Sequence, residues 1–226
     1  MQVALARLQY SIVESLLEVD PGIVLHGDTA IWRCYSGNRF SEDVDICATD
    51  AQVDKPGKLI TWSLSKRNIK MDYPLRTSRA VNVLSNDARS KFEAMEFPGG
   101  LKPVRMEFRK SNGSKMVVNT LSVGDFIKEK IPTYEKRKYV RDLYDICHLT
   151  RVGGLSIKFK RMLSHFLSQL EKPTDEKKLR DLLCVCVAPN FETKVKGIKG
   201  SKRSIPDTSE RSSLAQTFLC SNDLTS

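Results

Sequence analysis

The chain has 226 residues, 40% of them hydrophobic and 8% aromatic, so it can bury a core in one large domain or two small ones. No apolar run approaches the length of a membrane span, and the first twenty residues lack the features of a signal peptide, so we expect a cytoplasmic protein without a membrane partner. The net charge of +10 resides in the second half, because residues 1–99 hold 12 Lys/Arg and 13 Asp/Glu whereas residues 100–226 hold 25 and 14. This asymmetry favours a polyanionic partner such as a nucleic acid, although solvated basic helix faces would give the same balance.

The first part of the chain alternates predicted helices and strands. Apolar residues at helical spacing predict a helix over residues 2–18, which a turn at Asp20-Pro21-Gly22 ends. A short apolar strand over 23–25 leads into Gly27 and a helix that ends near residue 35. After a turn, the alternating residues 43–48 predict a second strand.

The middle of the chain is expected to extend the same sheet. Residues 51–70 favour a helix that begins after Pro56. Strand patterns follow, with one or two strands in 80–97, one over 104–109 and another over 116–119. The first half therefore predicts a mixed α and β core.

The second half is predicted to be mostly helical. Ser122 is suited to cap a helix that Pro132 must kink or restart. Helices are predicted over 140–150, over 157–170, and from 173 to near 187. Beyond residue 190 the chain is rich in Lys, Gly, Ser and Thr, which favours a flexible basic tail. We therefore expect a core over 1–121, a helical C-terminal domain over 122–189 and a tail over 190–226.

Two carboxylates on one predicted strand are the main functional signal. Asp43 and Asp45 are two residues apart on this strand, so their side chains share a face. Parallel carboxylates repel each other and raise each other's pKa, and a divalent cation relieves that conflict. Mg²⁺ commonly binds one or two carboxylates together with substrate phosphates. The pair therefore predicts a Mg²⁺ site for phosphoryl or nucleotidyl transfer.

Two further residues are candidates for this site. Gly27, between a strand and a helix, lets a phosphate approach a backbone N–H at a helix N-terminus. Glu107, in the middle of a later strand, is a candidate third metal ligand. The alternative for Glu107 is an exposed acid paired with Arg105 or Arg109.

Basic residues in the predicted helical part supply candidate phosphate contacts. Lys130 could contact a triphosphate as a point charge, and Arg137 could add a bidentate grip. Arg141 and Asp145 are four residues apart and share a helix face. Arg141 is a candidate phosphate clamp, with Asp145 orienting it or acting as the base for an acceptor hydroxyl, and the alternative is a surface ion pair of little consequence.

Three stretches resemble a known family. Gly27-Asp28-Thr29-Ala30 is the first, RFSEDVDI over residues 39–46 is the second, and the third runs from Lys130 through Arg137 to RDLYDI over residues 141–146. The pattern resembles the DNA polymerase beta-like nucleotidyltransferase superfamily, and more closely its AbiEii-type toxins of type IV toxin–antitoxin systems. The resemblance covers roughly residues 20–150, and the pairing of the second and third stretches is the specific part.

The resemblance implies an α+β fold with a mixed-sheet nucleotidyltransferase core and a helical C-terminal part. It implies transfer of a nucleoside monophosphate from a nucleoside triphosphate (NTP) with release of pyrophosphate, one or two Mg²⁺ ions, an RNA acceptor such as tRNA, and a cognate antitoxin. The expected catalytic residues are Asp43, Asp45 and Asp145, and the expected metal ligands are Asp43, Asp45 and Glu107. The expected nucleotide-binding residues are Gly27, Asp28, Thr29, Arg39, Ser41, Lys130, Arg137 and Arg141.

Asp28 departs from the family pattern, which has a second glycine or a serine at this position. A carboxylate there would repel a triphosphate unless a metal or Arg39 offsets it, or Asp28 might instead cap the helix. Two other functions stay open. In the first, the chain transfers the nucleotide to a protein or a small molecule. In the second, which Asp28 favours, the chain is an inactive nucleic-acid-binding module.

Overall fold

The structure is a computed structural model that describes residues 2–48, 56–72, 79–97, 100–110, 112–153, 155–178, 183, 195, 196 and 198. Its strands are β1 (Val24–His26), β2 (Asp43–Ala48), β3 (Lys70–Asp72), β4 (Ala80–Leu84), β5 (Arg89–Glu96), β6 (Val104–Arg109) and β7 (Lys115–Thr120). Its helices are α1 (Gln2–Val19), α2 (Gly27–Cys34), α4 (Pro56–Ser65), α5 (Val123–Arg137), α6 (Val140–Val152) and α7 (Ile157–Ser168). None of these helices is both long enough and apolar enough to cross a bilayer.

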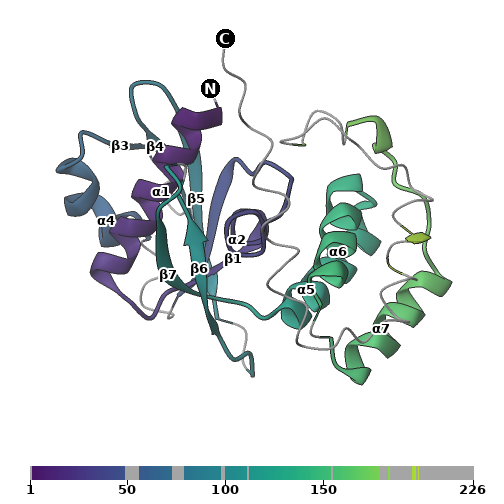
Figure 1. The fold of residues 1–226 in the computed structure, drawn as a ribbon. Helices are drawn as coiled ribbons and strands as arrows, with labels where there is room; N and C mark the ends of the chain where they lie inside the picture. Colours follow the sequence, from purple (N-terminus) through teal and green to yellow (C-terminus); the bar gives the residue numbers. More distant parts are fainter. Residues whose placement is uncertain are drawn as a thin grey trace, which may run out of the picture.

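The strands form one mixed sheet in the order β3-β4-β5-β2-β1-β7-β6. β1 runs antiparallel to β2 and parallel to β7, and β2 runs parallel to β5. Figure 1 shows α1 and α4 on one side of the sheet, with α2 and then α5, α6 and α7 on the other. The predicted α+β fold, a mixed-sheet core followed by helices, is confirmed.

The alternation along β2 and β5 decides which side chains face the pocket. Val44 and Ile46 are fully buried on the side of the sheet that packs against α1, as is Phe92 on β5. The intervening residues Asp43 and Asp45 of β2 and Lys91 and Glu93 of β5 are only partly buried and point to the opposite face. Four charged side chains therefore share one face of two adjacent strands.

One hydrophobic core joins the sheet to the C-terminal helices. Phe126 of α5, Leu143 of α6 and Phe166 of α7 belong to the same buried cluster as the residues of the sheet and α1. Ile198 also belongs to this cluster and is fully buried, although it lies in the stretch expected to be a flexible tail. The predicted core and helical domain therefore share a continuous interior.

Three local expectations differ from the structure. The helix expected over 51–70 ends at Ser65, because Asn68 adopts a left-handed conformation and the chain turns into β3. α5 continues through Pro132 as one helix, with Ile131 and Tyr134 buried on either side of the proline. The last predicted helix is a short 3-10 turn at Glu176–Lys178, followed by a β-bridge between Leu183 and Arg39, and the rest of its predicted range is not described.

Candidate active site

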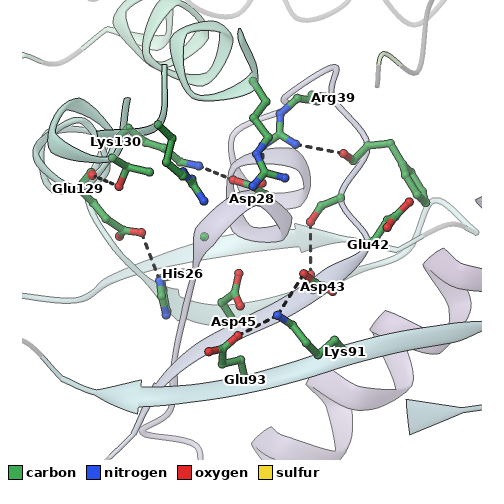
Figure 2. A pocket seen from close by; sticks show the side chains of 16 residues that line it. His26, Asp28, Arg39, Glu42, Asp43, Asp45, Lys91, Glu93, Glu129 and Lys130 are labelled. Carbon is green, nitrogen blue, oxygen red and sulfur yellow. Dashed lines mark hydrogen bonds and ion pairs between the residues drawn. The ribbon is translucent and has the colours of Figure 1, made fainter. Parts of the chain in front are cut away.

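A cavity of about 430 Å³ lies between the polar face of the sheet and the start of the helical part. Figure 2 shows its lining side chains, which come from β1, α2, the loop before β2, β2, β5, α5 and α6. The lining contains six carboxylates and five Lys or Arg side chains, and the residues are His26, Gly27, Asp28, Arg39, Phe40, Ser41, Glu42, Asp43, Asp45, Lys91, Glu93, Glu129, Lys130, Thr133, Arg137 and Arg141. Such a lining suits a highly charged ligand.

One wall of the cavity is formed by β2 and β5, and we call Asp43, Asp45, Lys91 and Glu93 the acidic wall. The parallel register places Asp43 beside Lys91 and Asp45 beside Glu93. The ammonium group of Lys91 lies 2.9 Å from Glu93 Oε2 and 3.6 Å from Asp43 Oδ2 (Figure 2). The predicted pair of acids therefore projects side by side into the cavity, joined by a third acid and a lysine.

The acidic wall contains more negative charge than its single lysine balances. Burial raises the pKa of Asp45 to about 6, and Asp28, Asp43 and Glu93 contribute while His26 opposes the shift. Burial also raises the pKa of Asp43, although Lys91 partly counteracts it. The protonation of these carboxylates is thus set by desolvation and by their mutual repulsion, which a bound cation would relieve.

Gly27 brings the start of α2 close to Asp45. Its φ of +68° is in the left-handed region that glycine adopts without strain. A Cβ atom at this position would lie 2.4 Å from Asp45 Oδ2, so no other residue fits without moving the carboxylate. The glycine predicted to admit a phosphate therefore also makes room for a carboxylate of the acidic wall.

Thr29 and Ser41 support the acidic wall through its backbone. The hydroxyl of Thr29 donates a hydrogen bond to the carbonyl oxygen of Asp43, and the Ser41 hydroxyl donates to the same oxygen at 3.3 Å. Gln9 in turn donates to the Ser41 carbonyl oxygen at 2.8 Å. Thr29 is fully buried and does not line the cavity, so it positions Asp43 instead of forming the expected nucleotide contact.

The opposite wall is a buried ion-pair network of Asp28, Arg39, Lys130 and Asp145, which we call the ion-pair wall. Arg39 donates to Asp145 Oδ1 through Nε at 3.0 Å and to Asp145 Oδ2 through Nη2 at 2.7 Å. Lys130 lies 2.9 Å from Asp145 Oδ2 and is also paired with Asp28. Two cations and two carboxylates therefore neutralise each other, with Arg39, Lys130 and Asp145 buried and Asp28 exposed to the cavity. Lys130 also lies 3.5 Å from Oδ1 of the buried Asp142.

Asp28 is neutralised on both sides. Arg39 Nη2 lies 2.7 Å from Asp28 Oδ2, and Lys130 pairs with the other carboxylate oxygen (Figure 2). Burial alone would raise the pKa of Asp28, but these two cations outweigh it and hold the pKa far below its usual range. Arg39 therefore forms the ion pair that, from the sequence, could offset the negative charge of Asp28. Asp28 is not the helix cap, because His26 occupies that position.

Asp145 lies behind the residues that line the cavity. It is 2% exposed, does not line the cavity, and holds Arg39 and Lys130. No ion pair joins it to Arg141 in the described part of the chain. The helix-face pairing expected from the sequence is therefore replaced by ion pairs to Arg39 and Lys130, which belong to two other elements.

Arg137 and Arg141 lie at the α5–α6 side of the cavity. Arg137 Nη2 lies 3.0 Å from Asp142 Oδ1, and its side chain is 38% exposed. Arg141 has a buried Nε atom with no hydrogen-bond partner among the described residues, and its guanidinium lies 5.7 Å from the centre of the Tyr139 ring. Arg141 is thus the lining cation with unused hydrogen-bonding capacity.

Glu107 must be removed from the predicted metal site. β6 is the edge strand, separated from β2 by β1 and β7, so Glu107 lies roughly 14 Å away across the sheet. Its carboxylate is exposed and pairs with Lys115 at 2.7 Å. The exposed ion-paired alternative fits this position, with Lys115 in place of the arginines.

Glu93 is the third acid that the sequence interpretation missed. It is the cross-strand neighbour of Asp45 and lines the cavity. The sequence contained a signal for its orientation, because buried and charged residues alternate along β5. Ser90, Phe92 and Ala94 are buried, so Lys91 and Glu93 share the opposite face. The sequence did not indicate that β5 pairs in parallel with β2, because β3 and β4 lie between these two strands in the chain.

His26 and Glu129 close the base of the cavity. His26 is buried, and its Nδ1 atom lies 3.6 Å from Glu129 Oε1 (Figure 2). Burial opposes protonation of the imidazole, but the Cys47 and Glu129 side chains outweigh it and raise the pKa of His26. The antiparallel register of β1 and β2 places His26 directly beside Asp45.

The acidic wall has the donor chemistry of a Mg²⁺ site. Carboxylate oxygens are the hard ligands that Mg²⁺ prefers, and Asp43, Asp45 and Glu93 offer them on one face. Among the described residues, no three His, Cys, Asp or Glu side chains are arranged as a group that could hold a metal ion by themselves. An ion bound to these carboxylates would therefore need further oxygen ligands, which Mg²⁺ commonly takes from substrate phosphates and water.

Comparisons with known proteins agree with the motifs. A family model described as "Nucleotidyl transferase AbiEii toxin, Type IV TA system" matches residues 12–184. The crystal structure of JHP933 from Helicobacter pylori superposes with a TM-score of 0.59 at 18% identity, covering 96% of this chain and 97% of that chain, which shows a shared fold. No curated protein matches the chain. Because the family model spans well over half of the sequence, this chain belongs to the AbiEii nucleotidyltransferase toxin family of type IV toxin–antitoxin systems.

Proposed function

We propose that the chain is a Mg²⁺-dependent nucleotidyltransferase that moves a nucleoside monophosphate from an NTP to an RNA acceptor, with Asp43 and Asp45 as the principal metal ligands. The single observation that carries this proposal is the pair of carboxylates projecting from β2 into a charged cavity beside Gly27. A metal bound there would neutralise charge on the triphosphate and hold it for in-line attack. Glu93 is the third carboxylate that we assign to this site in place of Glu107.

The cations of the cavity supply the triphosphate contacts in this proposal. Arg141 has a buried N–H without a hydrogen-bond partner among the residues that the structure describes, and we assign its guanidinium to a phosphate oxygen. Arg137 shares its guanidinium with Asp142 and can add a second contact. Lys130 and Arg39 already pair with acids, and their role is to hold Asp28 and the start of α2 in place.

The charge distribution supports RNA as the acceptor. Residues 100–226 carry 25 Lys/Arg against 14 Asp/Glu, and this half of the chain includes the α5–α6 side of the cavity. Lys and Arg neutralise a nucleic-acid backbone without reading its sequence. The type IV toxin–antitoxin family also implies a cognate antitoxin, which we propose as a partner.

Asp28 was the feature that favoured an inactive nucleic-acid-binding module. Its carboxylate is compensated by Arg39 and Lys130, so it does not present an unbalanced negative charge to a triphosphate. The argument that Asp28 prevents catalysis is therefore weaker. Transfer to a protein or a small molecule is the other alternative, and the transfer assay distinguishes it from transfer to RNA.

The test is a transfer assay with each of the four α-labelled NTPs, Mg²⁺ and total RNA. We expect label on RNA with the wild type and none above background with Asp43→Asn or Asp45→Asn. A loss of at least roughly a thousandfold is expected, because a metal contributes several kcal/mol to the transition state and each 1.4 kcal/mol is tenfold. The label should also disappear when Mg²⁺ is chelated.

Glu107→Gln is the matched control, because it removes an acid of the same sheet that lies outside the cavity. Its transfer rate should equal that of the wild type. Label on protein or on a small molecule would redirect the proposal to that acceptor. No transfer from any NTP by folded wild-type protein, with every acceptor class supplied, would contradict the proposed activity.

A further inference from the structure

The acidic wall contains a cation of its own. Lys91 extends from β5 between two carboxylates, at 2.9 Å from Glu93 Oε2 and 3.6 Å from Asp43 Oδ2 (Figure 2). Asp45 makes neither of these contacts, although it is the cross-strand neighbour of Glu93. The ammonium group thus covers the edge of the site between Asp43 and Glu93 and leaves the edge between Asp43 and Asp45 open.

We propose that Lys91 is a built-in cation that takes the place of a second divalent ion, so that the free protein binds one divalent ion at Asp43 and Asp45 and no other in this site. The inference rests on the proposed metal site and goes beyond it, because it fixes the number of ions and names the side chain that sets that number.

The charge balance supports this assignment. With all three acids ionised, the four side chains of the acidic wall carry a net charge of −2, which one divalent ion neutralises. Without the lysine the net charge is −3, which one divalent ion leaves incomplete. A second ion would need Glu93, the one carboxylate of the acidic wall that the first ion leaves free, and Lys91 contacts Glu93 as well as Asp43.

The fold keeps the ammonium group in this position. Phe92, the next residue along β5, is fully buried in the core, which fixes the face to which Lys91 points. Parallel pairing places Lys91 directly beside Asp43 on β2.

The test counts Mn²⁺ ions bound to the nucleotide-free protein by electron paramagnetic resonance, with Mn²⁺ as the probe for the divalent site. We expect one ion per chain for the wild type and two for Lys91→Gln. The conservative variant Lys91→Arg keeps the positive charge and should stay at one. The double variant Lys91→Gln/Glu93→Gln removes a carboxylate that the second ion needs, and should return to one.

Lys115→Gln is the matched control, because Lys115 forms the same kind of Lys–Glu pair on the same sheet, outside the cavity. It should bind one ion, as the wild type does. Two ions in the wild type, or one in Lys91→Gln protein that melts as a folded chain, would overturn the assignment of Lys91. No Mn²⁺ bound to any of the proteins would overturn it together with the metal site. The expected counts without any nucleotidyl transfer would instead contradict the proposed activity.

Discussion

The two walls of the cavity handle charge in opposite ways. In the ion-pair wall, Asp28 and Asp145 are matched at short distances by Arg39 and Lys130, both of which are buried. In the acidic wall, three carboxylates share a single, more exposed lysine. A balanced buried network stabilises one arrangement of the chain, whereas an excess of one sign costs stability unless a ligand corrects it. The difference supports the proposal that the acidic wall binds a ligand and that the ion-pair wall maintains the shape of the cavity.

The largest expected effect is on stability, and it separates the lysines of the two walls. Lys130→Met leaves Asp28 and Asp145 buried with fewer cations, and breaking a buried ion pair in this way costs about 3–5 kcal/mol of unfolding free energy. Lys91→Met removes a partner from a half-exposed pair, which is worth up to about 1 kcal/mol. Urea denaturation of both variants and the wild type measures the difference. Equal losses for the two lysines would contradict the distinction between the walls.

The next effect is the pH dependence of stability in the metal-free protein. Burial and nearby acids raise the pKa of Asp45 from 3.8 to about 6, so between these values the folded state binds a proton that the unfolded state has lost. This carboxyl therefore favours the fold at low pH, and its contribution falls as the pH rises from about 4 to 6. Relative to the wild type, Asp45→Asn should become progressively more stable across that window, as thermal melting measures.

Asp28→Asn is the contrasting variant for this measurement. Lys130 and Arg39 hold the pKa of Asp28 below its usual range, so its carboxylate stabilises the fold above pH 4, and that stability is lost only in strong acid. The Asn variant should therefore be less stable than the wild type at neutral pH. A constant difference between Asp45→Asn and the wild type from pH 4 to 7 would contradict the assignment of unbalanced charge to the acidic wall.

The sequence was sufficient for the parts of the site that are local along the chain. Asp43 and Asp45 share a face because a strand alternates with period two, and Gly27 marks the junction of β1 and α2. The mixed sheet followed by helices could be predicted from the order of apolar patterns. These features depend on residues within one or two adjacent elements, where periodicity is informative.

The parts that could not be predicted depend on strand order and on long-range pairing. Glu107 and Glu93 are both acids on strands with apolar neighbours, and only the strand order places one beside Asp45 and the other at the sheet edge. The roles of Lys130 and Asp145 likewise depend on pairs with Asp28 and Arg39, more than a hundred residues away. No periodicity in the sequence encodes such contacts.

The smallest expected effect concerns nucleotide affinity and Asp28, where the two walls meet. Asp28→Ser removes a carboxylate that compensates Arg39 and Lys130, so the ion-pair wall changes from neutral to net positive, with Asp145 as the remaining partner of both cations. We expect binding of NTP analogues with a non-hydrolysable α–β bridge to tighten by about tenfold, an electrostatic gain of the size that one pKa unit represents. Titration calorimetry with Mg²⁺ and each of the four analogues measures this change.

Asp28→Asn separates the two causes that could tighten binding in the serine variant. If the carboxylate weakens binding through its charge, the isosteric Asn variant should tighten affinity as much as Ser does. If the gain comes from a hydroxyl that bonds a phosphate, only Ser should show it. If neither variant binds more tightly, Arg39 and Lys130 already cancel the field of Asp28 at the phosphate position, and Asp28 then belongs to the ion-pair wall alone, as a carboxylate that fixes two cations and takes no part in nucleotide binding.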